Sequence, residues 1–466
     1  MWFVSSPSVE PSVSRVALLL GTLVALTVVG SSAVAVALPE VAAELQLDKP
    51  GTAWIVAAFS LSFSITTAVF GRLADLQGLR RPLRIGVVLL VTGSIAAALA
   101  PNFPSIVVAR LVQGAGAGAV PVLALGVLAA RFEGVARGRA LGALTAVVSI
   151  VSGSGPLIGG VIAELLGWRF VLAVPAVALL IMEPVARLAP AGGRVEGRID
   201  TRGAALVAAF TTGLVLILQS PATRPGPMLL AASIALLVGG AIALRAHVRR
   251  RPNGFLPLRV VANRSVVLTS LAGLTLLAGY LAALLSLPLM FTDEHGWRPL
   301  QIGLAMVPAA LLGAIASRVV GGTAQRLGRY RVAAWLALGS AAGLLVAAVG
   351  HSAPIVVLIA LGPVVAGFAA GQVALIDGLP ELVDEDVQGV ALGLFNLVFF
   401  TGGAVGSAIV GGLGGAFSIP VALAGVALLP AAGAVASLMI SRSGPTRPAD
   451  AEDRHHRARH ALHNQA

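Results

Sequence analysis

Long apolar runs separated by short polar or glycine-rich segments extend along the chain from residue 16 to residue 440. A helix of about 20 apolar residues is long enough to cross the hydrocarbon core of a bilayer. No segment between the runs is long enough to form a soluble domain, so the pattern predicts an all-α polytopic membrane protein. Its fourteen predicted spans are residues 16–38, 53–71, 84–101, 104–130, 139–165, 167–188, 203–220, 227–246, 265–291, 300–322, 332–350, 353–377, 388–413 and 416–440.

The first run has an alternative interpretation as a signal peptide. Arg15 precedes the apolar stretch, and an A-V-A sequence stands before Leu38. The run is long for the apolar core of a signal peptide, and further spans follow it at once, which favours a retained helix.

One short motif occurs twice, each time directly after an apolar run. Residues 71–81 read GRLADLQGLRR and residues 321–331 read GGTAQRLGRYR, so the copies are 250 residues apart. The repeat indicates a duplicated half, and it predicts two turns on the same side of the membrane. The residues that recur are Gly71, Ala74, Gly78 and Arg81, as Gly321, Ala324, Gly328 and Arg331.

The composition agrees with a membrane protein and excludes several other classes. Of the 466 residues, 57% are hydrophobic and 11% are charged, whereas a soluble protein has about 25% charged residues. Cysteine is absent, which excludes a disulfide framework and a Cys nucleophile. The net charge of +12 does not indicate nucleic-acid binding, because the arginines lie in short loops between apolar runs.

The distribution of these loop arginines predicts the orientation of the chain. Cytoplasmic loops carry an excess of Lys and Arg. We therefore expect a multi-pass protein of the plasma (inner) membrane with both termini in the cytoplasm. The inside loops then hold Arg72, Arg80, Arg81, Arg84, Arg131, Arg137, Arg139, Arg187, Arg194, Arg198, Arg202, Arg249, Arg250, Arg251, Arg259, Arg264, Arg326, Arg329 and Arg331, and the outside loops hold only Lys49, Arg169, Arg224 and Arg298.

Three polar segments depart from this pattern. Residues 377–386 form an inside loop that is acidic and contains no arginine. Residues 5–14 are rich in Ser and Pro, and residues 442–466 are polar, so both are predicted to be disordered tails. The histidines of the second tail could bind a metal, but a solvated tail is the favoured interpretation, and we predict no metal site.

Few charged residues lie inside the predicted spans. Arg110 lies several residues into the fourth span, where an unpaired arginine costs roughly 3 kcal/mol or more. It should face a cavity or a partner, unless it extends to the outer surface, and Gln113 follows one turn later. Glu183 is an acid inside an apolar run and a candidate proton site, although an interfacial ion pair with Arg187 is an equally good interpretation. Asp377 is an alternative acid, which could instead cap its helix.

Small and weakly polar residues suggest where helices pack and where a cavity lies. Gly155, Pro156, Gly159 and Gly160 make the fifth span bendable and allow close approach of a second helix. This is either a seam between two halves or ordinary helix packing. The shortage of charge favours a lipophilic or amphiphilic substrate. The cavity-lining candidates are Ser31, Ser32, Ser64, Tyr280, Gln372, Asn396 and Phe399.

The motifs resemble, in order along the chain, those of the major facilitator superfamily. Residues 71–81 resemble its motif A, residues 110–118 (RLVQGAGAG) its motif B, and residues 153–160 (GSGPLIGG) its motif C, which is typical of exporters. The repeat follows the second and the tenth spans, a separation of eight spans, which resembles the fourteen-helix drug:H⁺ antiporter branch of multidrug and tetracycline exporters. Further similarities to this branch are residues 168–175, 199–204, 255–259 and 391–412.

The resemblance implies a major facilitator fold with two six-helix bundles and two extra central helices. The implied divisions are an N-terminal tail (1–14), an N-terminal bundle (15–188), the inserted helices with their loops (189–264), a C-terminal bundle (265–441) and a C-terminal tail (442–466).

The resemblance also implies roles for the motif residues. Asp75, with Gly71, Gly78, Arg80 and Arg81, would form a latch across the two halves that holds one conformation and biases alternating access. The second copy has Gln325 in place of this Asp, so we expect a one-sided latch. The alternative is a charged turn that only sets topology. Arg110 and Gln113 would lie near the translocation path, and residues 155–160 would form a seam that limits leakage.

The implied function is export of small hydrophobic compounds by proton antiport. The energy source would be the proton gradient, with no cofactor, and the protein would be a monomer whose partners are its substrate, protons and the bilayer. No Walker loop, Ser-His-Asp set or metal-spaced His pair is found in the sequence, so we predict neither ATP use nor an enzyme. A membrane sensor without transport activity is a weaker alternative.

One departure from the family concerns the proton. The branch carries L-D-x-T-I-V-N-V-A-L-P in its first span, whereas residues 29–39 read VGSSAVAVALP. Gly30 replaces the membrane Asp and Ala35 replaces the Asn. An alternative function is therefore export of a lipid or an endogenous metabolite without the usual proton coupling.

Overall fold

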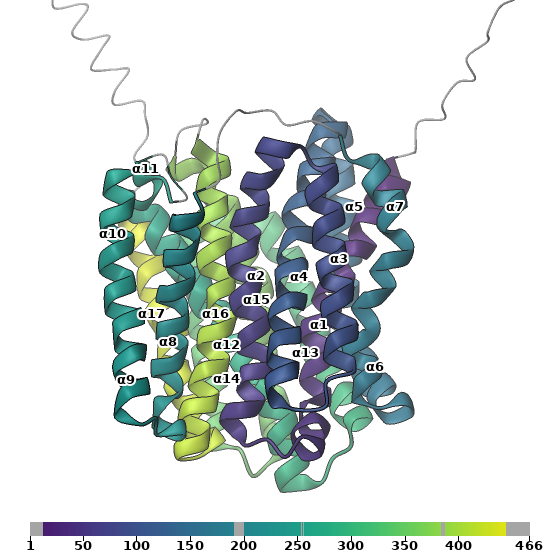
Figure 1. The fold of residues 1–466 in the computed structure, drawn as a ribbon, viewed down its shortest axis with the longest axis vertical. Helices are drawn as coiled ribbons and strands as arrows, with labels where there is room; N and C mark the ends of the chain where they lie inside the picture. The colour runs from purple at the N-terminus through teal and green to yellow at the C-terminus, as the bar shows by residue number, and fades with distance from the viewer. Residues whose placement is uncertain (1–12, 191–199, 253, 255, 384–386, 444–466) are drawn as a thin grey trace, which may run out of the picture.

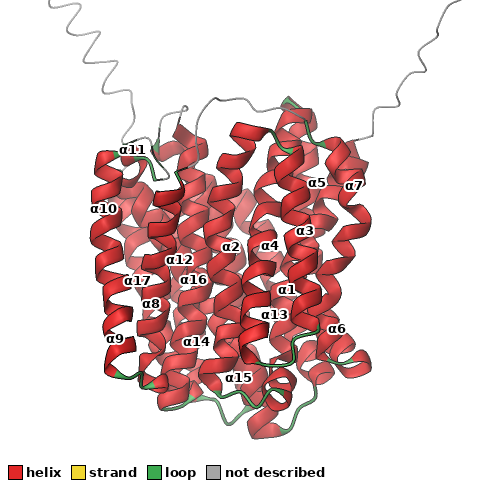
Figure 2. Ribbon diagram, in the orientation of Figure 1, coloured by secondary structure: helices red, strands yellow, loops and turns green. Residues whose placement is uncertain are grey.

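The computed structural model describes residues 13–190, 200–252, 254, 256–383 and 387–443. Nearly all of these residues are helical, and the described part contains no strand (Figure 2). The first helix begins at Val13 and the last ends at Ser443 on the same face of the bundle, at the top of Figure 1. We call this the terminal face and the opposite one the distal face. The predicted disordered tails lie almost wholly outside the described residues.

The first six spans form the N-terminal bundle. Asp48 begins the second of them as an N-cap, since its carboxylate accepts a hydrogen bond from the amide of Gly51 (2.8 Å). The sixth span is interrupted by a 3₁₀ turn at Pro175, which has no amide hydrogen to donate. The elements are α1 (Val13–Glu44), α2 (Lys49–Gln77), α3 (Arg80–Ala98), α4 (Phe103–Arg131), α5 (Gly134–Leu166), α6 (Trp168–Ala173), η1 (Val174–Val177) and α7 (Ala178–Leu188).

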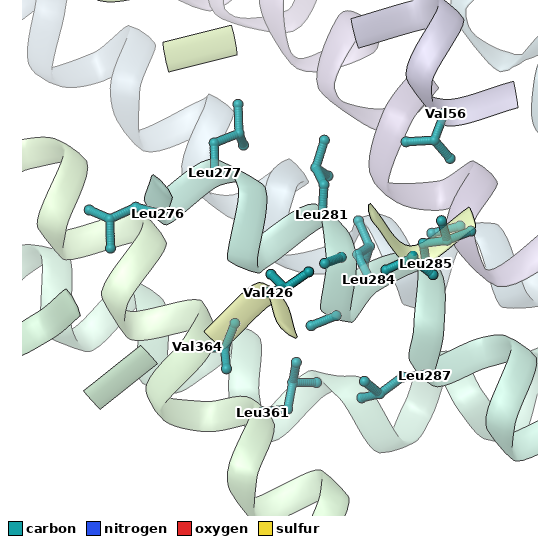
Figure 3. Packing of buried hydrophobic residues seen from close by; sticks show 14 of the residues in the cluster. Val56, Leu276, Leu277, Leu281, Leu284, Leu285, Leu287, Leu361, Val364 and Val426 are labelled. Atoms are coloured by element: carbon teal, nitrogen blue, oxygen red, sulfur yellow. The ribbon is translucent and has the colours of Figure 1, made fainter. Parts of the chain in front are cut away.

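The last six spans form the C-terminal bundle around its first helix, which is its most buried span. Apolar side chains surround this helix on several sides, and the same cluster of buried residues includes Val56 of α2 (Figure 3). The elements are α12 (Arg264–His295), α13 (Pro299–Leu327), α14 (Arg329–Val349), α15 (Pro354–Gly378), η3 (Leu379–Leu382), α16 (Gln388–Ala416) and α17 (Ile419–Ser443).

Two further spans lie between the bundles in sequence and beside them in space. α8 (Thr201–Thr223) packs against α16, since a Cβ at Gly412 would lie 2.0 Å from the carbonyl oxygen of Leu218. The next span packs on α8 and leaves most of its surface exposed (Figure 1). It consists of α9 (Pro227–Ile234), the π-helical η2 (Ala235–Gly239) and α10 (Gly240–Arg250), and the short α11 (Leu258–Val261) follows.

Most of the fourteen predicted spans coincide with long apolar helices. Thirteen helices in the described part are long and apolar enough to cross a membrane. The fifth predicted span, which is not among these thirteen, coincides with α5, a helix of 33 residues. The predicted all-α membrane fold is confirmed.

The sequence repeat is also a repeat of backbone geometry. Gly78 ends α2 with φ = 77°, and Gly328 ends α13 with φ = 86°. Residues with a Cβ rarely adopt positive φ values, so each copy needs glycine at this position. In both copies the following helix starts within two residues, which makes two tight turns on the terminal face.

The two bundles touch closely near the distal face, where α5 meets α13. A Cβ at Gly160 would lie 2.6 Å from the carbonyl oxygen of Pro299, and one at Gly303 would lie 2.5 Å from that of Pro156. At the edge of this contact, Arg298 Nη1 pairs with Glu164 Oε1 at 3.0 Å. The small residues thus bring the backbones of the two helices together without intervening side chains.

A second contact joins α2 to α16 and follows a similar course. Starting at the distal end, a Cβ at Gly415 would meet Pro50, one at Gly411 would meet Ala53, and one at Gly403 would meet Ser60. Nearer the middle of the bundle, the rings of Phe63 and Phe400 lie 4.3 Å apart.

The same two helix pairs separate toward the terminal face. Gly393 lies two turns before Phe400 on the same face of α16, yet a Cβ there would meet no atom within 4 Å. Gly142 lies 18 residues, or about five turns, before Gly160 on the same face of α5, and it too borders open space. The bundles are therefore closed at the distal face and apart at the terminal face. We call the space between them the terminal opening.

Candidate functional site

Arg110 is completely buried in the N-terminal bundle, and its partners are neutral groups. Its Nε donates to the carbonyl of Ile55 on α2 (3.0 Å), and its Nη1 donates to the carbonyl of Gly30 on α1 (3.0 Å) and to Gln113 Oε1. The guanidinium carbon also lies 4.3 Å from the ring centroid of Phe59. Carbonyl dipoles and a π face thus replace the water that a buried cation loses.

Gln113 extends this network to two more helices. Its amide Nε2 donates to Ser94 Oγ on α3 (2.8 Å) and to the carbonyl of Leu172 on α6 (3.4 Å). Arg110 and Gln113 together connect α4 with α1, α2, α3 and α6. The predicted partner of Arg110 is therefore found, but it is a set of neutral groups inside one bundle. Neither side chain is exposed to the terminal opening.

Gly30, which stands where the family branch carries an Asp, is directly next to this network. A Cβ at Gly30 would lie 2.9 Å from Pro175 Cγ and 3.8 Å from Gln113 Nε2. A larger side chain would collide with the sixth span or displace the Gln113 amide. The local packing therefore depends on glycine at the position where the family branch carries a carboxylate.

An array of aromatic rings begins at Phe59 and crosses from one bundle to the other. Phe59 and Phe63 of α2 have ring centroids 5.9 Å apart, and Phe63 contacts Phe400 of α16 across the interface. The array continues within the C-terminal bundle, with centroid distances of 5.1 Å for Phe400–Phe399 and 6.2 Å for Phe399–Phe368, and with Tyr280 stacked on Phe368 at 4.2 Å. We call this set, with Phe395 beside Phe399, the aromatic array.

Two polar amides lie one turn from the array on its terminal side. Gln372 follows Phe368 by four residues on α15, and Asn396 precedes Phe400 by four residues on α16. Both side chains are half-buried, and neither makes a hydrogen bond in the part of the chain that the structure describes. Phe59, Phe63, Phe395 and Phe399 are buried, whereas Tyr280, Phe368 and Phe400 are half-buried like the two amides. These half-buried rings and amides combine apolar groups with a few polar ones at the inner end of the terminal opening, which is typical of small-molecule sites.

Most of the predicted serines belong to helix packing. Ser32 and Ser64 are buried and donate to carbonyls of their own helices, Val28 (3.1 Å) and Leu61 (2.8 Å). Ser31 is half-buried and also bonds to the carbonyl of Val28 (2.9 Å). The structure therefore brings Tyr280, Phe399, Gln372 and Asn396 together and leaves these serines out.

The residues that resemble motif C divide between two helix contacts. Gly155 and Gly159 face α1, where their added Cβ atoms would lie 2.0 Å from Ser32 Oγ and 2.3 Å from the carbonyl of Ala33. Pro156 and Gly160 form the contact with α13 described above. This segment therefore packs both within its own half and against the other half, through adjacent faces of one helix that are about 100° apart.

The turn that resembles motif A is fixed to the N-terminal bundle. Gly71 lies near Val122 of α4, and Arg80 Nε donates to the carbonyls of Ala186 (3.1 Å) and Ala189 (3.2 Å) at the end of α7. Arg81 is exposed. The side chains of Asp75 and Gln325 lie outside the described residues, so the latch stays a prediction.

The two candidate proton sites lie at the terminal ends of their helices in ion pairs. Glu183 receives two hydrogen bonds from Arg84 Nη2 (2.9 and 3.0 Å) and also pairs with Arg187 (3.3 Å), on an exposed surface between α3 and α7. Asp377 pairs with Arg329 (2.7 Å), which also contacts Glu381. Both contacts are interfacial ion pairs, away from the aromatic array.

The sequence indicated only part of this site. Phe59, Phe63, Phe368 and Phe400 were not among the predicted residues, because an isolated Phe in an apolar run is an ordinary core residue. One signal was available: Phe59 and Phe63, like Phe395 and Phe399, are spaced by four residues and lie on one helix face. Within the described residues no group of acids and histidines could hold a metal ion.

Comparisons with known proteins agree with this arrangement. The family model of the Major Facilitator Superfamily matches residues 18–407 and, in a second match, residues 269–464. The chain is 29% identical over 386 residues to the multidrug resistance protein Stp of Mycobacterium tuberculosis, covering 81% of this chain and 71% of that protein. It is 29% identical over 444 residues to the lincomycin resistance protein of Streptomyces lincolnensis, covering 91% of each.

A solved structure shares the fold. It is a bacterial homolog of the human lysosomal transporter Spinster, in an inward-facing and unoccupied conformation. The TM-score is 0.67 with 14% sequence identity, over 93% of this chain and 98% of that one.

Substituting Arg110 tests its role as the connection between helices. Arg110→Ala leaves the carbonyls of Gly30 and Ile55 and the Gln113 amide without their donor, so we expect a loss of about 2–4 kcal/mol of stability. Arg110→Lys should recover only part, because an ammonium cannot reproduce the planar fork. The measurement is unfolding of the purified protein in detergent, with Arg187→Ala, an exposed arginine, as control. Equal stability of the Arg110→Ala and Arg187→Ala proteins would contradict this role.

Substituting Glu183 distinguishes an ion pair from a proton site. Because its carboxylate is held by two arginines on an exposed surface, we expect Glu183→Gln to retain export within about twofold, as expected for loss of exposed ion pairs. The measurement is drug accumulation in cells that express the variant, at matched protein levels. If Glu183→Gln instead abolishes the part of export that depends on the pH gradient, Glu183 would be a proton-binding site. Asp377→Asn tests the second candidate acid in the same way.

Proposed function

We propose that this chain, which belongs to the major facilitator superfamily, exports small hydrophobic or amphiphilic compounds such as drugs, antibiotics and dyes. The names of two relatives, a multidrug resistance protein and a lincomycin resistance protein, support this substrate class. A membrane transporter confers resistance most directly by moving the compound out of the cell. The apolar lining of the site supports the same class, since rings and two amides bind by shape and hydrophobicity.

The observation that carries the proposal is the one-sided closure of the two bundles. Glycine-rich contacts close the distal face, and the aromatic array lies where those contacts end and the terminal opening begins. In the proposed cycle a compound enters the terminal opening and binds against the array. The distal contacts then separate while the terminal ends of α5 and α13, and of α2 and α16, come together. This is alternating access between two states of the same chain.

We propose that the protein lies in the plasma membrane and that its terminal face is on the cytoplasmic side. The assignment rests on the loop arginines, which are concentrated in the turns of that face. The conformation described here is then inward-facing, and it can receive a compound from the cytoplasm. One chain contains both bundles and the whole of the opening between them, so we propose a monomer.

We propose a proton gradient as the energy source and Asp75 as a latch residue. The latch would act in the outward-facing state, when the terminal ends of the bundles meet. No obvious site for a transported proton is found among these groups. The network around Arg110 contains no carboxylate, and Glu183 and Asp377 are engaged in ion pairs at the terminal face. This favours a second candidate, export of a lipid or an endogenous metabolite without the usual proton coupling.

Uptake into inverted membrane vesicles tests these proposals. Vesicles with the wild-type chain should accumulate a fluorescent lipophilic dye or a radiolabelled antibiotic when a pH gradient is present, and accumulation should fall when the gradient is collapsed. A matched control is Gly160→Leu, which should block the distal contact between α5 and α13 and reduce transport. Uptake that persists without the gradient would contradict proton coupling and favour the second candidate. No uptake of any such compound would contradict drug export.

A further inference from the structure

Arg318, like Arg110, lies several residues inside a predicted span, and no role has been assigned to it. It lies in α13, nine residues before the helix ends at Leu327, which is about 14 Å along the helix axis. The residue is exposed. A charged side chain at such a position is expensive and usually serves a pathway or a ligand.

The helix periodicity places Arg318 at the terminal opening. Leu300 of α13 packs against Gly160 of α5 at the distal contact. Arg318 follows Leu300 by 18 residues, about five turns, so it lies on the same face of α13. Gly142 precedes Gly160 by the same interval on α5, and it borders open space. Arg318 and Gly142 thus lie on the same faces of α13 and α5 that touch near the distal end. At the level of these two residues, nearer the terminal face, the helices have separated.

Among the residues that the structure describes, no carboxylate pairs with Arg318. In the described part of the chain it makes no ion pair or hydrogen bond, whereas Arg84, Arg298 and Arg329 all have carboxylate partners. α13 itself contains no acid.

The acids of the neighbouring helices lie at or beyond their ends. On the α5 side, Glu133 precedes the helix and Glu164 pairs with Arg298 at the distal face. On α15, Asp377 pairs with Arg329. The terminal part of α5 adds Arg137 and Arg139, so the sign of the charge around this part of the opening is positive.

We propose that Arg318 binds the acidic group of an amphiphilic substrate whose apolar part rests against the aromatic array. A guanidinium offers a planar pair of donors that matches a carboxylate, phosphate or sulfonate, and such charge-assisted hydrogen bonds are stronger than those between neutral groups. The positive opening would attract anions and disfavour permanent cations. The inference rests on the proposed function, because it adds a charge preference to the same hydrophobic site.

Binding of a matched ligand series to the full-length protein tests the inference. The probes are a naphthylhexanoic acid, its uncharged methyl ester and the corresponding trimethylammonium compound, measured by fluorescence with protein in phosphatidylcholine vesicles. We expect the acid to bind more tightly than the ester, and the cation most weakly. Arg318→Gln should weaken binding of the acid about tenfold and that of the ester less than twofold. Arg318→Lys should fall between the wild type and Arg318→Gln. Arg326→Gln, an exposed arginine of the same helix, should change neither.

Three other results would overturn the inference, each in a different way. Equal affinity of the wild type for acid and ester, or equal weakening of both by Arg318→Gln, would show that Arg318 does not recognise the acidic group. An effect that appears only when phosphatidylglycerol is added would assign Arg318 to an anionic lipid headgroup. If the wild type binds none of the three probes, the hydrophobic site itself fails, and with it the proposed function.

Discussion

The close contact of α5 with α13 near the distal face is the constraint on which the functional arrangement depends. Gly160 and Gly303 allow the two backbones to meet, and a side chain at either position would separate them. Because the helices are stiff and touch near one end, they diverge toward the other, as α2 and α16 do. The terminal opening, the position of the aromatic array at its inner end and the exposure of Gln372 and Asn396 all follow from this geometry.

Within the N-terminal bundle the corresponding constraint is the buried charge of Arg110. In a bilayer such a charge has to be satisfied by the protein itself, and here two main-chain carbonyls, an amide and a phenyl ring do so. The network ties five helices into a unit that can move as one body against the C-terminal bundle. It also uses the carbonyl of Gly30, so the residue that the family branch would use for proton handling contributes to packing here.

Hydrophobic patterning was sufficient to predict the helices, because an apolar run of about 20 residues is stable in a bilayer as a helix. The arrangement of these helices in two bundles was expected from the family resemblance of the motifs. The turn at Gly78 and its copy at Gly328 were predictable, since the motif needs glycine at a positive φ. The site was only partly predictable. Tyr280, Gln372, Asn396 and Phe399 stood out as polar or aromatic residues in apolar runs, but Phe63 and Phe400 meet only through the packing of two bundles. The partners of Arg110 were hidden from the sequence, because main-chain carbonyls carry no residue identity.

Distances between spin labels would test the one-sided closure most directly. The chain has no cysteine, so single pairs can be introduced without removing native thiols. One pair, at positions 142 and 321, would report the terminal ends of α5 and α13, where both glycines border open space. A second, at the exposed positions 165 and 304, would report their distal ends. The account predicts that without substrate the terminal pair is farther apart than the distal pair, and that conditions driving transport shorten the first distance while lengthening the second. A terminal pair that is the closer of the two without substrate, or two distances that change in the same direction, would contradict it.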